Sequence, residues 1–81
     1  NSTDASIIYN SKICTRLKSL DVSYTSISDA SLIAIAKNCT GLQLLTTYGC
    51  NGLSSEELHH EFNSISKLRA VLLLIYPSLP I

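Results

Sequence analysis

Apolar and polar side chains recur along the chain with a period of 25 residues, which is the pattern of a repeated structural unit. The aligned pairs at this offset are Asp4 with Asp29, Ala5 with Ala30, Ser6 with Ser31, Ile7 with Leu32, Ile8 with Ile33, Lys12 with Lys37, Cys14 with Cys39, Leu17 with Leu42 and Leu20 with Leu45. The next copy is one residue longer, and the extra residue falls in the loop at Asn51 and Gly52. Chance does not readily give so many matches at one offset in 81 residues.

The first half of each copy is predicted to be a short strand. It opens with a cysteine or isoleucine, continues with leucines three residues apart, and reaches an alternating pair such as Leu20 and Val22, whose side chains share one face. Parallel strands lie about 4.8 Å apart, so equivalent side chains of successive copies should align. The expected ladders are Leu20 with Leu45 and Val71, Val22 with Thr47 and Leu73, and Cys14 with Cys39 and Ile65.

The second half of each copy carries the signals of a helix. Ser28 precedes apolar positions at helical spacing, which predicts a helix over 29–38 with Ser28 as its N-cap. Asp29 would favour the positive end of that helix electrostatically. Residues 3–13 have the same pattern and are predicted to be the helical half of an earlier copy.

A third helix is predicted over 55–63. Ser54 and Glu57 have the spacing of a capping box, in which two side chains satisfy the amides at a helix start. Leu58 and Phe62 are four residues apart and would share one face of that helix.

Together these features resemble the leucine-rich repeat, and specifically its cysteine-containing subclass, whose unit of about 26 residues carries a Cys, then LxxLxL, a second Cys and a helix. The pattern appears here as CTRLKSLDVSYTSISDASLIAIAKN and CTGLQLLTTYGCNGLSSEELHHEFNS, and the resemblance extends from residue 3 to about residue 74. It is specific at Cys14, Cys39 and Cys50. It departs at Thr25, which stands where the next copy has Cys50, and at Ile65, which replaces the leading Cys of the third copy.

The resemblance implies an α/β leucine-rich-repeat solenoid, like ribonuclease-inhibitor-like arrays, with about three helix–strand repeats and a short parallel sheet on its concave face. We expect one segment over 1–81. Its parts are a partial copy 1–13, copies 14–38 and 39–64, a terminal partial copy 65–76 and a tail 77–81. The tail prolines cannot continue a ladder or a helix. The mid-copy start and the lack of polar caps predict a fragment or an assembly-dependent piece.

The side chains between the core leucines would face a partner, because the concave face is the binding surface of such arrays. The expected protein-binding residues are Ser19, Asp21 and Ser23 in the first strand, Leu44, Thr46 and Tyr48 in the second, and Ala70, Leu72 and Leu74 in the third. Tyr48 is the best candidate, because it combines an apolar ring with a polar tip. For Leu72 and Leu74 two alternatives stay open: a partner surface, or cover by the tail or a neighbouring chain.

Composition narrows the possible partners and the compartment. Six basic and six acidic side chains cancel, so nothing marks a surface for nucleic acid or an anionic membrane. The longest apolar run, 70–76, is shorter than the roughly 20 residues that span a bilayer. Three cysteines, an odd number without a CxxC pair, predict buried reduced thiols and a cytoplasmic location, and we expect no bridge between Cys14 and Cys39.

No residue set predicts catalysis. His59 and His60 would point about 100° apart on a helix, so with the neighbouring glutamates they do not converge on a metal. Cys50 has no orienting group that would make it a nucleophile. The chain has no nucleotide-binding or metalloprotease motif, and we expect no enzymatic activity, no cofactor and no metal.

The favoured function is therefore a protein–protein interaction module that binds an unidentified protein partner through its concave face. The resemblance implies substrate recognition for an F-box-type ubiquitin ligase, but no F-box-like segment is present to carry the ligase role over. The alternative is a structural repeat segment built into a larger complex, such as a ciliary or mitochondrial assembly. Charged residues make up 15% of the chain, against about 25% on average, which favours contact with a larger chain or complex.

Overall fold

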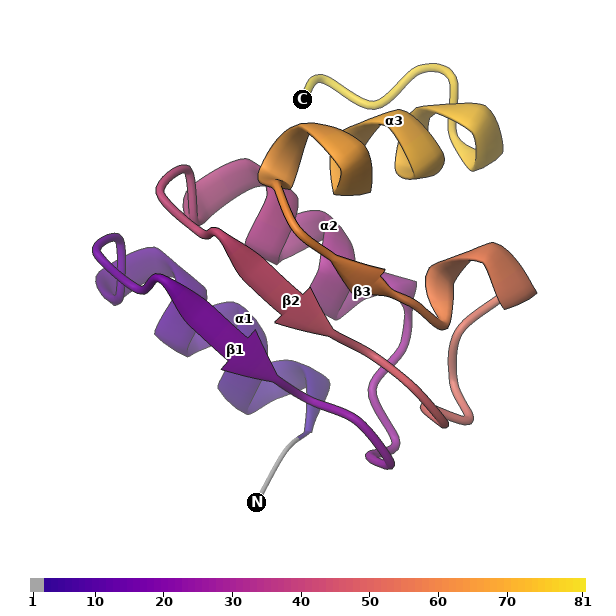
Figure 1. Cartoon of the computed structure of the whole chain (residues 1–81), viewed down its shortest axis with the longest axis horizontal. Helices are drawn as coiled ribbons and strands as arrows, with labels where there is room; N and C mark the ends of the chain where they lie inside the picture. Colours follow the sequence, from indigo (N-terminus) through magenta and orange to yellow (C-terminus); the bar gives the residue numbers. More distant parts are fainter. Residues whose placement is uncertain (1–2) are drawn as a thin grey trace.

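Within residues 3–81, three α-helices and three strands follow one another along the chain (Figure 1). Their order is α1 (Asp4–Ile13), β1 (Ser19–Asp21), α2 (Asp29–Asn38), β2 (Leu44–Thr46), the 3-10 turn η1 (Glu56–Leu58), β3 (Glu61–Phe62) and α3 (Ile65–Ile75). These elements are those of a computed structural model that describes residues 3–81, so the first two residues of the expected partial copy 1–13 lie outside the described residues. The predicted α/β class is confirmed.

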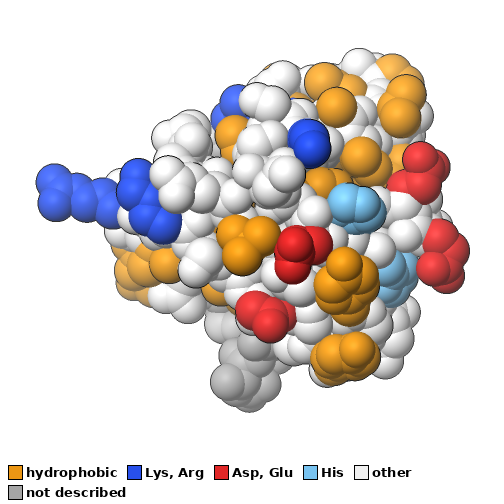
Figure 2. Space-filling model, viewed as in Figure 1, with side chains coloured by type: hydrophobic (Ala, Val, Ile, Leu, Met, Phe, Trp, Pro, Cys, Tyr) orange, Lys and Arg blue, Asp and Glu red, His pale blue; other side chains and the backbone are white. Residues whose placement is uncertain are grey.

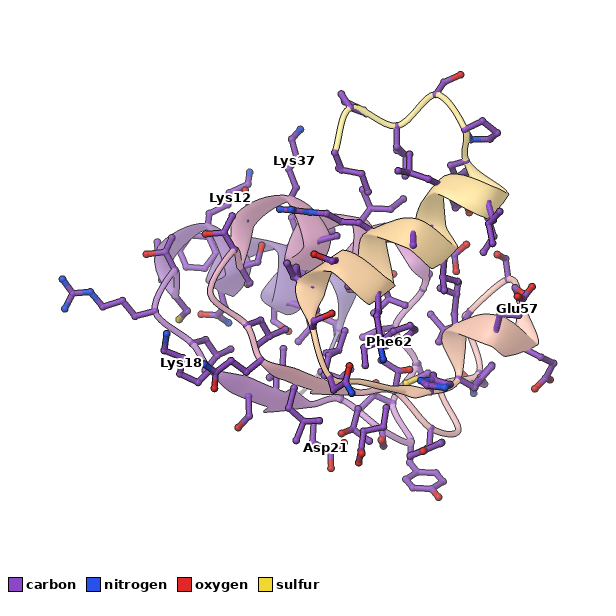
Figure 3. The ribbon with its side chains drawn as sticks, turned by 45° about the horizontal axis from the view of Figure 1, so that its top comes forward. Lys12, Lys18, Asp21, Lys37, Glu57 and Phe62 are labelled. Carbon is purple, nitrogen blue, oxygen red and sulfur yellow. The ribbon has the colours of Figure 1, made fainter. Side chains whose placement is uncertain are left out.

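The helices share one side of the sheet and leave its other side open (Figures 1 and 3). β1 and β2 pair in parallel, with Ser19 opposite Leu44, Leu20 opposite Leu45 and Asp21 opposite Thr46. Each of these pairs is separated by 25 residues, the period of the sequence pattern. The predicted pairing of the first two strands, and of Leu20 with Leu45, is therefore confirmed.

The starts of α1 and α2 are built from the same residue types. Ser28 is the N-cap of α2 and its side chain accepts a hydrogen bond from the Ala30 amide, as the sequence predicts. Thr3 caps α1 by accepting from the Ser6 amide. Both helices carry an aspartate in the first turn and a lysine in the last, which suits the helix dipole. The two helices pack side by side (Figure 1).

The predicted helix over 55–63 is wrong. The segment forms η1, capped by Ser55 rather than Ser54, and then β3, which runs antiparallel to β2 with Phe62 opposite Leu45. The buried Thr47 hydroxyl accounts for the change, because it donates to the Leu58 carbonyl and accepts from the His60 amide at 3.1 Å. These bonds hold the backbone beside β2, where it cannot continue as a helix.

The predicted third parallel strand is also wrong, because residues 65–75 form α3. Its buried side chains, Leu68 and Leu72, are four residues apart, and Ser64 caps the helix by accepting from the Lys67 amide. Val71 and Leu73 therefore extend no strand ladder, and Ile65 opens a helix instead of aligning with the two cysteines. The expected site residues Ala70, Leu72 and Leu74 lie on α3 rather than on the sheet.

One hydrophobic core lies between the sheet and the helices. Its buried members are Val22, Ile27, Leu32, Ile35, Ala36, Cys39, Leu42, Leu45, Cys50, Leu58, Phe62, Leu68 and Leu72. The tail folds back on this core, since Tyr76, Leu79 and Ile81 pack against it. The Tyr76 hydroxyl donates to the Asp29 carboxylate of α2, so the tail is attached to the start of a helix far from it in the sequence.

Candidate functional site

The sheet face turned away from the helices, here called the open face, carries six of the nine predicted partner-binding residues. They are Ser19, Asp21, Ser23, Leu44, Thr46 and Tyr48. Leu20 and Leu45 alternate with them and pack into the core, which turns the neighbouring side chains outward. Figure 3 shows Asp21 pointing away from the helices.

The middle of the open face is a row of three side chains across all three strands, in which Asp21 and Glu61 are exposed and Thr46 is half-buried. Asp21 lies opposite Thr46, and Thr46 lies opposite Glu61, so two carboxylates flank one hydroxyl. Among the described residues, neither carboxylate forms an ion pair with a lysine, arginine or histidine. This row therefore offers negative charge to a partner, although the chain as a whole is neutral.

Ser23 orients the first of these carboxylates. Its amide donates to Asp21 Oδ1 at 2.9 Å, and this backbone bond, with a further contribution from the Ser23 side chain, lowers the pKa of Asp21. The Ser23 hydroxyl also accepts from the Tyr48 amide at 3.1 Å. One serine thus links the carboxylate of the first strand to the backbone that presents Tyr48.

Two tyrosines stand at the end of the open face. Tyr48 is 45% exposed and Tyr24 is 82% exposed. The Tyr24 amide donates to the Tyr48 carbonyl at 2.7 Å, so both lie in neighbouring turns. Half-exposed aromatic rings with a polar tip are typical of protein interfaces. In Figure 2, which views this face, hydrophobic side chains stand next to acidic ones.

Tyr24 is not among the residues predicted from the sequence, although a signal for it exists. Tyr24 aligns with Gly49 at the 25-residue offset, and both residues have a positive φ, 58° and 67°. This backbone region favours glycine, so a tyrosine there is retained against a local strain. A Cβ at Gly49 would lie 2.4 Å from the Tyr24 ring, so only glycine lets the ring lie across that turn.

The three remaining predicted residues are not brought to the open face. Leu72 is fully buried and belongs to the core, where it packs as a residue of α3 and not of a covered strand. Ala70 is exposed and Leu74 is 75% exposed, and both lie on α3. The tail covers neither of them.

Cys14, Cys39 and Cys50 are free thiols, so no disulfide joins Cys14 to Cys39. Cys39 and Cys50 are buried, whereas Cys14 is exposed, which corrects the expectation for that residue. Burial, and then the neighbouring Cys14, raises the pKa of Cys39, which disfavours a reactive thiolate. The Cys50 thiol donates to the Val22 carbonyl at 3.0 Å.

The described residues also lack two other kinds of feature. In the range 3–81, no three His, Cys, Asp or Glu side chains come together in a way that could bind a metal ion. The helices over the same range are all too short, or too polar, to cross a bilayer. In comparisons with known proteins, no family model, no curated protein and no solved structure matches this chain.

Proposed function

We propose that the chain is a protein-interaction module of the leucine-rich-repeat type, which binds a protein partner through the open face of its sheet. The observation that carries this proposal is the row of Asp21, Thr46 and Glu61, whose two carboxylates form no ion pair among the described residues, set beside the exposed Leu44 and Tyr48. A rigid surface of this kind loses little conformational entropy on binding.

The repeat-type part of the proposal is supported by contacts that recur between copies. The Asp4 carboxylate accepts from the amide and the hydroxyl of Ser28, at 2.9 and 2.7 Å. The Asp29 carboxylate accepts from the same two groups of Ser54, at 2.9 and 2.5 Å. Each helix start therefore binds the residue that precedes the next helix-like segment, as stacked units of a solenoid would do.

The partner that fits this face has basic side chains near apolar ones. Asp21 and Glu61 would pair with Lys or Arg, whereas Leu44 and Tyr48 would pack against apolar groups. The resemblance to F-box leucine-rich-repeat proteins suggests that such a partner is a substrate delivered to a cytoplasmic ubiquitin ligase.

The test uses two variants on the open face and two matched controls on the helices. Tyr48→Ala and Asp21→Lys should each weaken partner binding about fivefold or more, the loss typical of a residue at an interface centre. Tyr9→Ala on α1 and Lys37→Glu on α2 alter exposed side chains of similar type away from that face and should bind normally. Partners are captured by cross-linking in a cell extract, and purified partners are then titrated.

Thermal unfolding shows whether each variant is folded, because exposed substitutions should change stability by less than about 0.5 kcal/mol. If both open-face variants remain folded and capture the partner as well as the controls do, another surface binds it.

A second candidate function is that of a structural segment in a larger complex. The apolar surface at the α1 and β1 end of the fold favours it. A cavity of about 290 Å³ opens there beside Ile7, Leu17 and Leu20. Tyr9 and Ile13 on α1 are exposed. A segment that depends on permanent burial of this end would aggregate or associate when purified. Sedimentation combined with thermal unfolding separates the two functions, because the interaction module should unfold cooperatively as a monomer.

A further inference from the structure

A second surface lies on the helix side of the sheet, between α3 and η1. A groove of about 380 Å³ opens there, here called the α3 groove, and it is lined by Glu57, His60, Phe62, Lys67, Ala70 and Val71. Its volume falls at the small end of the range of ligand sites, about 300–1,000 Å³. Phe62 alternates with Glu61 along β3, so Phe62 points to the helix side of the sheet and Glu61 to the open face.

The floor of the α3 groove is apolar. The Phe62 ring is buried in the core and packs against the His60 ring, with 5.1 Å between the ring centroids. Ala70 and Val71 form the wall on α3. Figure 3 shows Phe62 pointing beneath α3, with Glu57 at the far side on η1. An apolar side chain would displace water from this floor with little rearrangement of the protein.

The apolar surface extends from the groove along α3. Leu74 is 75% exposed and lies one helical turn beyond Ala70, on the same side of the helix. The surface is therefore longer than one small molecule requires, and an extended ligand with successive side chains would cover more of it. Figure 2 shows hydrophobic side chains over α3 near acidic side chains at the edge of the molecule.

The two ends of the groove carry opposite charges. Glu57 lies on η1, and Lys67 lies in the first turn of α3, where the helix dipole adds positive potential and no acidic side chain is present. Among residues 3–81, neither charged group has an ion-pair or side-chain hydrogen-bond partner. A ligand that complements both ends has a negative group over α3, an apolar body and a positive group over η1.

We propose that the α3 groove binds a peptide segment of a partner protein in which apolar side chains lie between an acidic and a basic residue. This site is separate from the open face, so it stands whether or not the proposed function is correct. It also gives a role to Leu74, which the sheet does not use.

The test compares two fluorescein-labelled peptides by anisotropy, one with a leucine pair next to aspartate and one with the same pair next to arginine. Lys67→Glu should weaken binding of the aspartate peptide about two- to fivefold and strengthen binding of the arginine peptide, from the usual size of an exposed charge pair. Glu57→Lys should have the reverse effects. A folding defect would weaken both peptides together, so opposite signs identify a direct contact.

Controls separate the groove from general charge effects. Glu56→Lys makes the same change as Glu57→Lys, one residue earlier on η1, and Lys37→Glu makes the same change as Lys67→Glu, but on α2. Neither Glu56 nor Lys37 lines the groove, so both variants should bind the peptides like the original protein. Leu74→Ser should weaken both peptides. Tyr48→Ala on the open face should leave both unchanged.

Three results would overturn the proposal. The first is an absence of saturable binding by either peptide. The second is a response in which Glu56→Lys matches Glu57→Lys. The third is a different occupant of the groove. Competition by free leucine as strong as that by the peptides would make the occupant a small molecule, and self-association that Leu74→Ser abolishes would make it a second copy of the chain.

Discussion

Replacing Asp29 by asparagine should destabilise the protein strongly, although the two side chains have nearly the same shape. Asp29 is 7% exposed. It accepts from the Ser54 amide at 2.9 Å, from the Ser54 hydroxyl at 2.5 Å and from the Tyr76 hydroxyl. It thereby joins the start of α2 to the segment before η1 and to the tail.

The magnitude follows from the charge on the acceptor. A hydrogen bond to a charged group contributes about 1.5–3 kcal/mol, whereas one between neutral groups contributes about 0.5–1.5 kcal/mol. Asparagine keeps one oxygen that can accept from the Ser54 amide, and its NH2 group must donate to the Ser54 and Tyr76 hydroxyls instead of accepting from them. Replacing three charged bonds by neutral ones should therefore cost about 3–4.5 kcal/mol. A chain of this length has a total stability of about 4–12 kcal/mol. The melting temperature should fall by about 12–36 °C, at about 4–8 °C for each kcal/mol in a domain this small.

The pH dependence supplies a second signature. Burial alone would raise the pKa of Asp29, but the hydrogen bonds from the Ser54 hydroxyl, Tyr76 and the Ser54 amide outweigh burial and lower it. A carboxyl whose folded pKa is depressed stabilises the protein fully above its unfolded pKa of about 3.9, and that stability is lost as the pH falls through the folded pKa. Asp29→Asn removes this ionisation, so the stability difference between the two proteins should shrink as acid is added.

Thermal unfolding followed by circular dichroism at several pH values measures both effects. Tyr76→Phe removes one donor and should give a smaller loss, whereas Asp21→Asn changes an exposed carboxylate and should have little effect on the melting temperature. A melting temperature for Asp29→Asn close to that of the original protein, with an unchanged acid response, would show that these bonds do not hold the units together.

Two further substitutions test the turn and the strand that bring the third copy beside the second. Gly52→Ala should destabilise the protein by about 1–3 kcal/mol, because the added Cβ would lie 2.4 Å from the Ile27 carbonyl oxygen. That oxygen belongs to the backbone and cannot move away as a side chain could. A denaturant titration with no change in midpoint would contradict this prediction. Thr47→Val should cost about 1–3 kcal/mol by leaving the His60 amide without its hydroxyl acceptor, and faster hydrogen exchange of that amide would confirm the reason.

The sequence predicted the first two copies well because their pattern specifies contacts as well as elements. Leu20 and Leu45 are aligned in adjacent strands, and their equivalence was visible as a fixed offset. Ser28 begins a helix for a local reason, the capping of its first amides, that does not depend on the rest of the fold. Where local and repeated signals agree, sequence reasoning needs no tertiary information.

The third copy failed because one apolar run satisfies two periods. Residues 68–73 fit the strand pattern of leucines, but Ile65, Leu68, Leu72 and Ile75 fit a helix equally well, with steps of three and four. A short apolar run does not by itself distinguish a buried strand from a buried helix. The Ser64 cap and the good helix formers Lys67, Leu68, Arg69 and Ala70 were the signals that decide for the helix.

The site prediction followed the fold prediction in the same way. The six residues of β1, β2 and the turns that follow them share the open face, because period-2 alternation holds wherever the strand exists. Leu72 was misplaced because the same alternation was applied to a helix. Its burial shows that an assignment of the element must precede an assignment of the surface.

A polar position shows where the repeat stops more clearly than any apolar one. Asp4 and Asp29 each bind the serine before the next segment, but the equivalent residue of the third copy is Ser55, which has no carboxylate. The third copy therefore lacks the carboxylate that makes these contacts in the first two. Asp29 instead accepts a further bond from Tyr76, so the tail is attached to the last carboxylate of the series. The loss of an acid at a repeated position, and not the loss of a leucine, is thus the signal that the chain leaves its repeating pattern.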